Sequence, residues 1–435
     1  MALDDIAPAS PAAAEFARRK AVAAALRDVD AGEDPNVAAA ALGVDRETFN
    51  ALAREAAEAR KARLTAALPL RFHDAPEDAE KEIHQDLSAL ISTGDGEGLW
   101  IGADEGAALE RLSAERGDDG RIIGYGGHKR FHLNDFFDFP NGEDEEADVE
   151  GLSIADGYLW VVGSHSLKRR KPKRGQEPDE ALARLTEVVR EANRFLLGRI
   201  PLVAGDRPGV PELARKAPAL DGSSPKRKAG CVAMGRKHSA LSRLLAKDVH
   251  LGPFMRTPSK DNGLDIEGVA VRGERVFLGL RGPVLRGWAV VLELRFEAKR
   301  SGALKLQPVD EDGALYAKHF LDLDGLGVRS LMLDGQDAVL LAGPTMDLDG
   351  PVRLYRWRGA LASQESSIVP RAQVERVLDM PFGEGVDHAE GATLIPLKPG
   401  DPPALVVAYD TPAADRVLID GDGALADVFE LPEHW

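Results

Sequence analysis

The stretch DIEGVAVRGERVFLGLRGP, residues 265–283, decides the fold. It predicts a β-hairpin because two apolar runs, IEGVAV and VFLGL, flank the polar turn RGER. A single hairpin is only marginally stable in water, so the chain must supply partners for it. Similar units begin near residues 86, 148, 327 and 388, and each places a polar turn between two apolar strands.

These units recur at a nearly constant spacing. Their starts at residues 86, 148, 265, 327 and 388 are separated by 62, 117, 62 and 61 residues, so the long interval is close to two periods. Self-similarity at a fixed period indicates a repeat architecture. Further strand-like runs lie between the hairpins, and four antiparallel strands per repeat are typical of a propeller blade. We therefore predict an all-β protein, a β-propeller of five four-stranded blades, with six blades as the alternative.

The remaining segments predict an arm, an insertion and a closing strand. Residues 1–66 are rich in Ala, Arg and Glu, which predicts a short helical arm that packs on the propeller or binds a protein partner. The propeller is expected over residues 67–435, with a basic and partly helical insertion at about 168–258. LPLRFHD, residues 68–74, is expected to pair with the last blade, and DRVLIDG, residues 415–421, to give that blade one of its own strands. Closure of the ring removes exposed sheet edges.

The composition limits the partners and the compartment. A net charge of −17 makes nucleic acid and anionic membranes unfavourable partners. The one cysteine, Cys231, excludes an intramolecular disulfide and argues against a cysteine-based metal cluster. No run approaches the roughly 18 apolar residues of a membrane helix, and the first residues lack the features of a secretory signal. The expectation is a soluble cytoplasmic protein.

Carboxylates occupy equivalent positions near the start of the predicted first strands. The first strand of each blade lines the central channel, so these side chains are expected to meet at one mouth of the channel. The glutamates are Glu150, Glu267 and Glu390. The residues two positions earlier, on the same face of an extended chain, are Asp148, Asp265 and His388. The fourth unit carries Arg329 at the glutamate position.

Other polar residues are expected near the same mouth. They lie just after the second strands or just before a first strand, and are Asp104, Glu105, His165, Arg281 and Lys260. Arginine suits bidentate contact with a carboxylate or phosphate, so Arg281 and Arg329 are expected to contact an anionic ligand. Lys260, Asp104 and Glu105 are further candidates for ligand binding.

Two interpretations of the carboxylates remain open. In the functional interpretation they hold a divalent cation (Ca²⁺, Mg²⁺ or Mn²⁺), which prefers oxygen ligands. The candidate metal ligands are Asp148, Glu150, Asp265, Glu267 and Glu390, and the candidate acid/base catalysts are Glu150, Glu267, Glu390 and His165. In the structural interpretation, each glutamate pairs with an arginine, a lysine or the backbone of the next blade and joins the blades together.

Several long strings also resemble a known family. GLWIGADE, DVEGLSIADGYLWVVGSHS, PSKDNGLDIEGVAV and GLRGPVLRGWAVVLELRF resemble a bacterial family described only as a domain of unknown function, over about residues 67–435. That family is similar to phytase-like and esterase-like propeller repeats with EGLA-type motifs. A phytase-type activity would imply calcium bound by dense acidic loops, and the sequence lacks a full set of such loops.

The leading hypothesis is a ligand-binding β-propeller whose acid-rich mouth holds a small anionic ligand, a metal or a protein segment. The first alternative is a metal-assisted hydrolase of phosphate or carboxylic esters. The second alternative is a protein-interaction scaffold that uses the arm and the insertion. A divalent cation is the one cofactor that the sequence suggests.

Overall fold

The computed structural model describes most of the chain. The described residues are 33–73, 82–142, 145–173, 175–223, 226–363, 365–419, 421–433 and 435, with positions 18, 21, 22, 24–26 and 29 near the start. Most of the first half of the expected helical arm, and residue 74 of the expected closing strand, therefore lie outside the described residues.

Antiparallel sheets of four or more strands follow one another along the chain. The first contains β2 (Leu87–Ser92), β3 (Gly98–Ala103), β4 (Ala108–Arg116) and β5 (Ile122–His132). The second contains β6 (Val149–Ala155), β7 (Tyr158–Gly163), β10 (Leu197–Arg207) and β11 (Val210–Leu213), with β14 (Gly230–Cys231) beside β10.

The next two sheets have the same plan. One contains β15 (Asp265–Arg272), β16 (Arg275–Gly282), β17 (Trp288–Ala298), β19 (Ala317–Asp322) and β23 (Ser367–Ile368), and β18 (Leu304–Gln307) pairs with β17. The other contains β20 (Gly327–Asp334), β21 (Asp337–Gly343), β22 (Val352–Trp357) and β24 (Val374–Met380).

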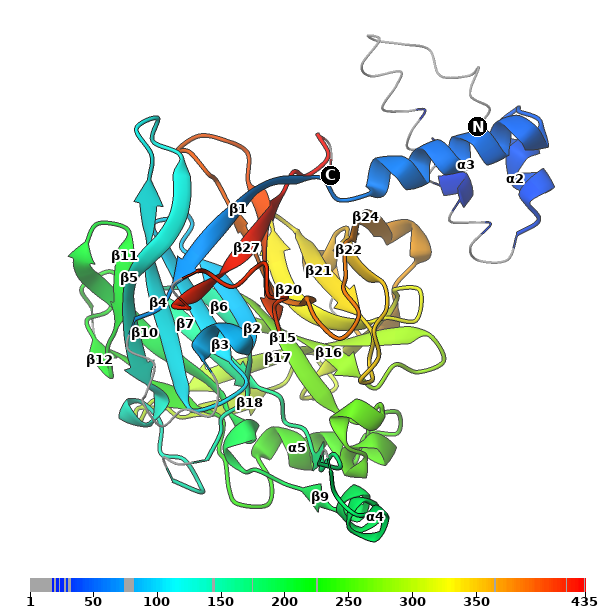
Figure 1. Cartoon of the computed structure of the whole chain (residues 1–435). Helices are drawn as coiled ribbons and strands as arrows, with labels where there is room; N and C mark the ends of the chain where they lie inside the picture. The colour runs from blue at the N-terminus through cyan, green and yellow to red at the C-terminus, as the bar shows by residue number, and fades with distance from the viewer. Residues whose placement is uncertain are drawn as a thin grey trace.

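The last sheet joins the two ends of the propeller. Its strands run in the order β25 (His388–Ile395), β26 (Ala404–Asp410), β27 (Gly423–Phe429) and β1 (Leu64–Arg71). β1 pairs with β27 antiparallel, with Leu68 opposite Ala426, and meets β5 of the first sheet at Leu70 and Tyr125 (Figure 1). The closing strand expected at residues 68–74 is confirmed where it is described, and it begins earlier, at Leu64.

The prediction of a strand at DRVLIDG is wrong. Its described residues, 415–419, form a turn with an isolated bridge between Val417 and Ala424. The reason is that β26 and β1 already occupy both edges of β27, so no edge is left for a further strand. The last blade therefore takes its outer strand from the beginning of the chain.

The first strands of these sheets form a closed cycle. β2 contacts β6, β6 contacts β15, β15 contacts β20, β20 contacts β25, and β25 contacts β2. Inner strands that meet around one axis, each with its own sheet extending outward, define a β-propeller. Apolar side chains fill the space between neighbouring sheets, and Trp100, Trp160 and Phe277 on the second strands are almost fully buried there.

Short elements decorate the sheets. The small β-pairs are β8 (Lys168–Arg169) with β9 (Val188–Val189), and β12 (Lys216–Ala217) with β13 (Arg227–Lys228). The 3₁₀ turns are η2 (Ile83–Gln85), η3 (Leu133–Asp135), η4 (Asn193–Phe195), η5 (Gly252–Arg256), η6 (Ser259–Asp261), η7 (Ala360–Ala362) and η8 (Arg371–Gln373). The helices of the insertion are α4 (Pro178–Thr186), which buries none of its side chains, and α5 (Ala240–Leu245).

The described part of the arm consists of α2 (Pro35–Ala41) and α3 (Arg46–Arg60). Asp34 and Asp45 accept hydrogen bonds from backbone N–H groups at the two helix starts, as N-caps do. Phe49 and Leu52 are buried in a small apolar cluster of the arm itself, and α3 contacts the propeller at β24 (Figure 1). Within the described residues, no helix has the length and apolar character that crossing a membrane requires.

Candidate functional site

A β-bulge marks the same position in each described inner strand. The pairing with the second strand skips one residue near the strand start, and the skipped residues are Ser88, Glu150, Glu267, Arg329 and Glu390. A bulge leaves one residue out of the ladder and redirects its side chain. The repeat position that the sequence singled out is therefore a distinct backbone feature, and the first unit fills it with serine.

The glycine after each glutamate allows the inner strands to approach closely. A Cβ added to Gly151 would lie 2.9 Å from the backbone nitrogen of Val269, and one added to Gly268 would lie 2.7 Å from the Cβ of Leu331. Both distances are too short for a real side chain. The Glu-Gly pair thus combines a redirected carboxylate with a tight contact to the neighbouring inner strand.

Five carboxylates gather at this end of the channel in two groups that share Glu150. The first group is Asp104, Glu150 and Glu390, and the second is Glu150, Asp265 and Glu267. In each group, one oxygen from every residue lies within 4.8 Å of the others. Asp104 comes from the end of β3, whereas the other four stand near the starts of β6, β15 and β25.

Arg281 neutralises most of the second group. Its guanidinium donates a hydrogen bond to Asp265 Oδ2, and its Nε lies 2.8 Å from Glu267 Oε1. Arg329 Nη1 adds a longer charge contact of 3.6 Å to Glu267 Oε2. Asp265 and Glu267 are only 1% and 2% exposed, so the arginines replace the water that would otherwise solvate these charges.

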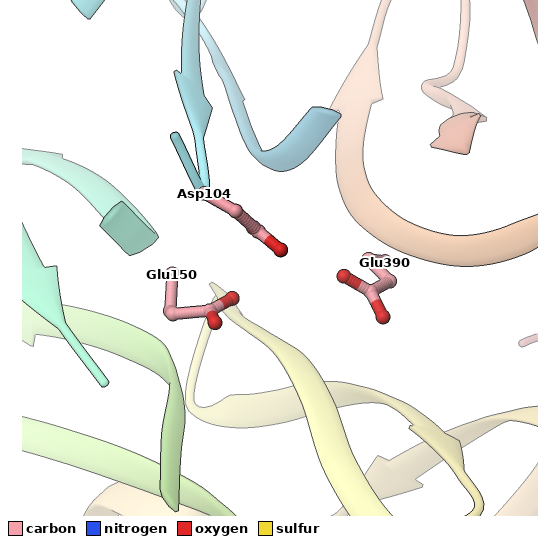
Figure 2. A group of neighbouring side chains, drawn as sticks. All are labelled: Asp104, Glu150 and Glu390. Atoms are coloured by element: carbon pink, nitrogen blue, oxygen red, sulfur yellow. The ribbon is translucent and has the colours of Figure 1, made fainter. Parts of the chain in front are cut away.

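In the first group, two of the three carboxylates have no arginine among the described residues paired with them. Asp104 Oδ1 is buried without a hydrogen bond, and Glu150, 8% exposed, forms no hydrogen bond or ion pair with any described residue. Glu390 accepts a hydrogen bond from Arg329, which joins it to the arginine side of the site. Figure 2 shows the three side chains pointing toward one common space from separate strands.

Burial and mutual repulsion raise the pKa values of these carboxyl groups. Burial is the main cause for Asp104 and Glu150, followed by the negative charge of Glu390 on Asp104 and of Asp104 on Glu150, so both pKa values lie well above the ordinary range. Burial also raises the pKa of Glu267 to about 8, although Arg281 and Arg329 act in the opposite direction. Without a bound cation, burial and repulsion therefore favour the protonated form of these carboxyl groups.

Asp148 and His388 lie at the edge of the site and are paired. Arg194 Nη1 donates a hydrogen bond of 2.5 Å to Asp148 Oδ2, and neither carboxylate group includes Asp148. His388 Nδ1 lies 3.7 Å from Asp410 Oδ2, and the closeness of this carboxylate raises the pKa of the imidazole. The imidazole and a hydrogen bond from the Thr411 hydroxyl lower the pKa of Asp410 against the effect of burial.

The other expected residues lie apart from the two groups. His165 is buried, its Nδ1 lies 3.0 Å from the carbonyl oxygen of Gly163, and burial lowers its pKa to about 4. It is therefore a neutral imidazole and a weak base. Lys260 pairs with Asp347 at 3.7 Å; burial raises the pKa of Glu390, and the charge of Lys260 opposes this rise from a distance. Glu105 is exposed and belongs to neither group.

Comparison with known proteins identifies the family. A family model described as "Protein of unknown function (DUF3616)" matches residues 86–427, which is most of the chain. The chain belongs to this family. The expected membership of a family of unknown function is thereby confirmed, whereas the similarity to phytase-like and esterase-like repeats stays a prediction. The comparison with curated proteins returned no match.

Solved structures similar to this DUF3616 protein include propellers of different kinds. The β-propeller domain of Cps50 (Swd1) from Myceliophteria thermophila shares 9% identity with a TM-score of 0.32, covering 85% of this chain and 100% of that one. Regucalcin from Agrobacterium tumefaciens, a calcium-binding protein, shares 10% identity with a TM-score of 0.29, covering 80% and 92%. Likeness at this level carries no statement about a shared site or activity.

Proposed function

We propose that this DUF3616 protein is a ligand-binding β-propeller that holds one oxygen-preferring divalent cation at the mouth of its channel. Asp104, Glu150 and Glu390 would bind the cation. The observation that carries the proposal is that the carboxylates of Asp104 and Glu150 face each other and form no ion pair with any described residue. We also propose five blades, since each inner strand of the closed cycle begins one sheet.

The charges at the mouth favour a cation. Five carboxylates face two guanidinium groups, so three negative charges remain uncompensated when all are ionised. Two carboxylates 4.8 Å apart repel each other by roughly 3 kcal/mol at an effective dielectric constant of 20. A divalent cation would remove this repulsion and would replace the protons that the raised pKa values otherwise retain.

The donor set fits Ca²⁺, Mg²⁺ or Mn²⁺. These ions take carboxylate oxygens, and Ca²⁺ accepts six to eight of them in a flexible geometry. Three carboxylates supply only part of such a shell, which leaves positions for water or for an oxygen atom of a small molecule. Arg329, which already donates to Glu390, would help to hold an anionic group beside the cation.

Calorimetric titration of metal-free protein with Ca²⁺, Mg²⁺ and Mn²⁺, each alone, tests the proposal. We expect at least one of them to bind, and Asp104→Asn and Glu150→Gln each to weaken that binding by roughly tenfold or more because each removes a charged ligand. Glu274→Gln, an exposed turn residue, is the matched control and should leave the affinity unchanged. Absence of binding by all three ions, or equal binding by all variants, would contradict the proposal.

A metal-assisted hydrolase is the second candidate. The favouring observation is that the carboxyl groups of the site differ in their pKa values: the pKa of Glu150 is raised, whereas the pKa of Asp410, whose charge acts on Asp104 and Glu390, is lowered. Such divergence provides one group that favours its proton and one that favours the ionised form. A panel of phosphate and carboxylic esters, assayed with and without the bound ion, should then show turnover that Glu150→Gln abolishes. Turnover that survives in Glu150→Gln would exclude this carboxyl group from the chemistry.

A further inference from the structure

The central channel has a second mouth, at the other end of the inner strands. The carboxylates stand at the strand starts, whereas the strand ends enclose a cavity of about 310 Å³. Leu152 and Ile154 of the cavity wall lie two and four positions after Glu150 on β6, which corresponds to about 7 Å and about 13 Å of extended strand. The cavity is therefore distinct from the carboxylate site, and its volume lies at the lower end of the range for small-molecule sites, roughly 300–1,000 Å³.

The wall of this cavity combines aliphatic side chains with polar groups, and polar atoms make up the larger part of its surface. Every inner strand contributes to it, and the large apolar members are Ile91, Leu152, Ile154, Leu331, Leu333 and Leu394. A hydrocarbon group placed here would lose contact with water on several sides, which is the usual source of affinity in small-molecule sites.

Two buried hydroxyl groups in the wall have unused hydrogen-bond donors. Ser153 Oγ accepts a hydrogen bond of 3.2 Å from the Val271 N–H, and Thr393 Oγ1 accepts one of 3.1 Å from the Ser92 N–H. Each hydroxyl thereby satisfies an amide on the free edge of the next inner strand. Neither donates its own proton to any described residue, although Ser153 is 8% exposed and Thr393 1%. The Ser92 hydroxyl differs, since it donates to the Thr93 carbonyl at 2.9 Å.

A guanidinium group without a partner stands at the rim. Arg272 follows Val271 directly, lines the cavity and forms no ion pair or hydrogen bond with another described residue. The exposed acidic residue Asp156 also lines this cavity; it acts electrostatically on Arg199 and forms no ion pair with Arg272. The cavity therefore offers the Arg272 guanidinium and two unused O–H donors, which suit an anionic acceptor, and an anion would bind on the side of the cavity away from Asp156.

We propose that this second mouth binds a small organic carboxylate with an aliphatic body. The carboxylate accepts hydrogen bonds from Arg272 and from Ser153, which lie on the adjacent strands β15 and β6. The hydrocarbon lies against the leucine and isoleucine side chains, and Thr393 provides a further donor on the other side of β2. This site is independent of the cation proposed at the carboxylate mouth.

Binding of hexanoate to the full-length protein in the presence of EDTA tests the proposal. Calorimetry and thermal melting should show saturable binding of hexanoate, and binding of hexan-1-ol and hexylammonium should be at least tenfold weaker because neither offers an anionic acceptor. Equal binding of hexanol and hexanoate, or no binding of hexanoate, would overturn the assignment.

Two variants and a labelling experiment locate the site. Arg272→Gln changes an exposed side chain and should weaken hexanoate binding by about tenfold while leaving hexanol binding unchanged. Ser153→Ala should weaken it further, and Ser153→Thr, which keeps the hydroxyl, should restore it. A diazirine analogue of hexanoate should label residues 152–156 or 271–273. Unchanged affinity in Arg272→Gln, or labelling confined to the carboxylate mouth, would contradict the proposal whether or not Ser153→Ala folds.

Discussion

The two carboxylate groups at the channel mouth share Glu150 and differ in what faces them. Arg281 lies against Asp265 and Glu267 and compensates their charge from within the chain. Asp104 and Glu150 form no ion pair with any described residue, although Glu150 is buried and Asp104 is half-buried. In one group an arginine of the chain pairs with the carboxylates, whereas in the other group two of the three carboxylates form no ion pair with a described residue. We therefore propose a structural role for the group around Arg281 and a ligand-binding role for the group around Asp104.

Removal of β1 should cause the largest loss of stability. It opens the ring of sheets, and this ring is what places Glu390 next to Glu150. Leu68 and Leu70 of β1 are almost fully buried, and losing two buried leucines alone costs about 4–10 kcal/mol, comparable to the whole stability of a domain. A chain lacking residues 1–71 should show no cooperative thermal unfolding by circular dichroism.

A chain lacking only residues 1–60 is the matched control for that deletion. It retains β1 and should unfold cooperatively near the wild-type midpoint. Similar midpoints for the two truncated chains would mean that β1 does not close the propeller.

Arg281→Met should cause the second largest loss of stability, since it removes the guanidinium group that pairs with Asp265 and Glu267. Asp265 and Glu267 would be left buried without their cation, and breaking a buried ion pair costs about 3–5 kcal/mol of unfolding free energy. Urea unfolding in EDTA measures this loss. Saturating Ca²⁺ or Mn²⁺ should restore part of it, because the second group then becomes able to bind an ion.

Arg358→Met is the control for Arg281→Met. Arg358 also contacts two carboxylates, Asp337 and Glu375, but it is 37% exposed, and ion pairs of this kind contribute about 0–1 kcal/mol. Equal losses in the two variants would show that Arg281 has no special role.

Gly268→Ala tests the close approach that brings Glu267 to the mouth. The added methyl group would lie 2.7 Å from the Cβ of Leu331, and overpacking of this kind costs about 1–3 kcal/mol. Gly94→Ala, where the new Cβ meets no atom within 4 Å, should leave the unfolding free energy nearly unchanged. Urea unfolding compares the two, and a tolerated Gly268→Ala would show that the inner strands have room to separate.

The pH dependence of stability should show a small effect for each pH unit and each titrating carboxyl group. A carboxyl group with a raised pKa keeps its proton in the folded state after the unfolded chain has lost it. Its stabilising contribution is therefore complete below the ordinary pKa and is lost as pH rises, up to about pH 8 for Glu267. The loss is at most about 1.4 kcal/mol per pH unit for each such proton.

Unfolding of the metal-free protein between pH 5 and pH 8, compared with Glu150→Gln, isolates the contribution of the open group. The wild-type protein should lose stability more steeply than the variant as pH rises, and a saturating cation should flatten this difference. Parallel pH profiles for the two proteins would mean that Glu150 titrates normally.

The sequence predicted the repeat and the convergence of its glutamates because both follow from spacing. Glu150, Glu267 and Glu390 recur in the same short motif, and strands that line one channel bring such positions together. The bulge at each of these positions was not predictable, since it depends on the register between two strands rather than on the residues of one.

The partners of the carboxylates also required the structure. Arg194, which holds Asp148, lies 46 residues further along the chain, in a segment outside the repeat pattern. Spacing alone placed Arg281 and Asp104 equally near the mouth. Only their side-chain positions show that Arg281 compensates Asp265, whereas Asp104 faces Glu150 as a second uncompensated charge. The cavity at the other mouth could not be predicted from the sequence, because the aliphatic residues of its wall look like those of any buried β-strand.

The number of divalent ions bound per chain tests the central claim most directly. Equilibrium dialysis against Ca²⁺ or Mn²⁺, followed by elemental analysis, should give one ion per chain for the wild-type protein, because Arg281 occupies the second group. A value of zero would show that the open carboxylates are simply protonated, and a value of two at the channel mouth would show that Arg281 does not close its group. Either result would contradict the account.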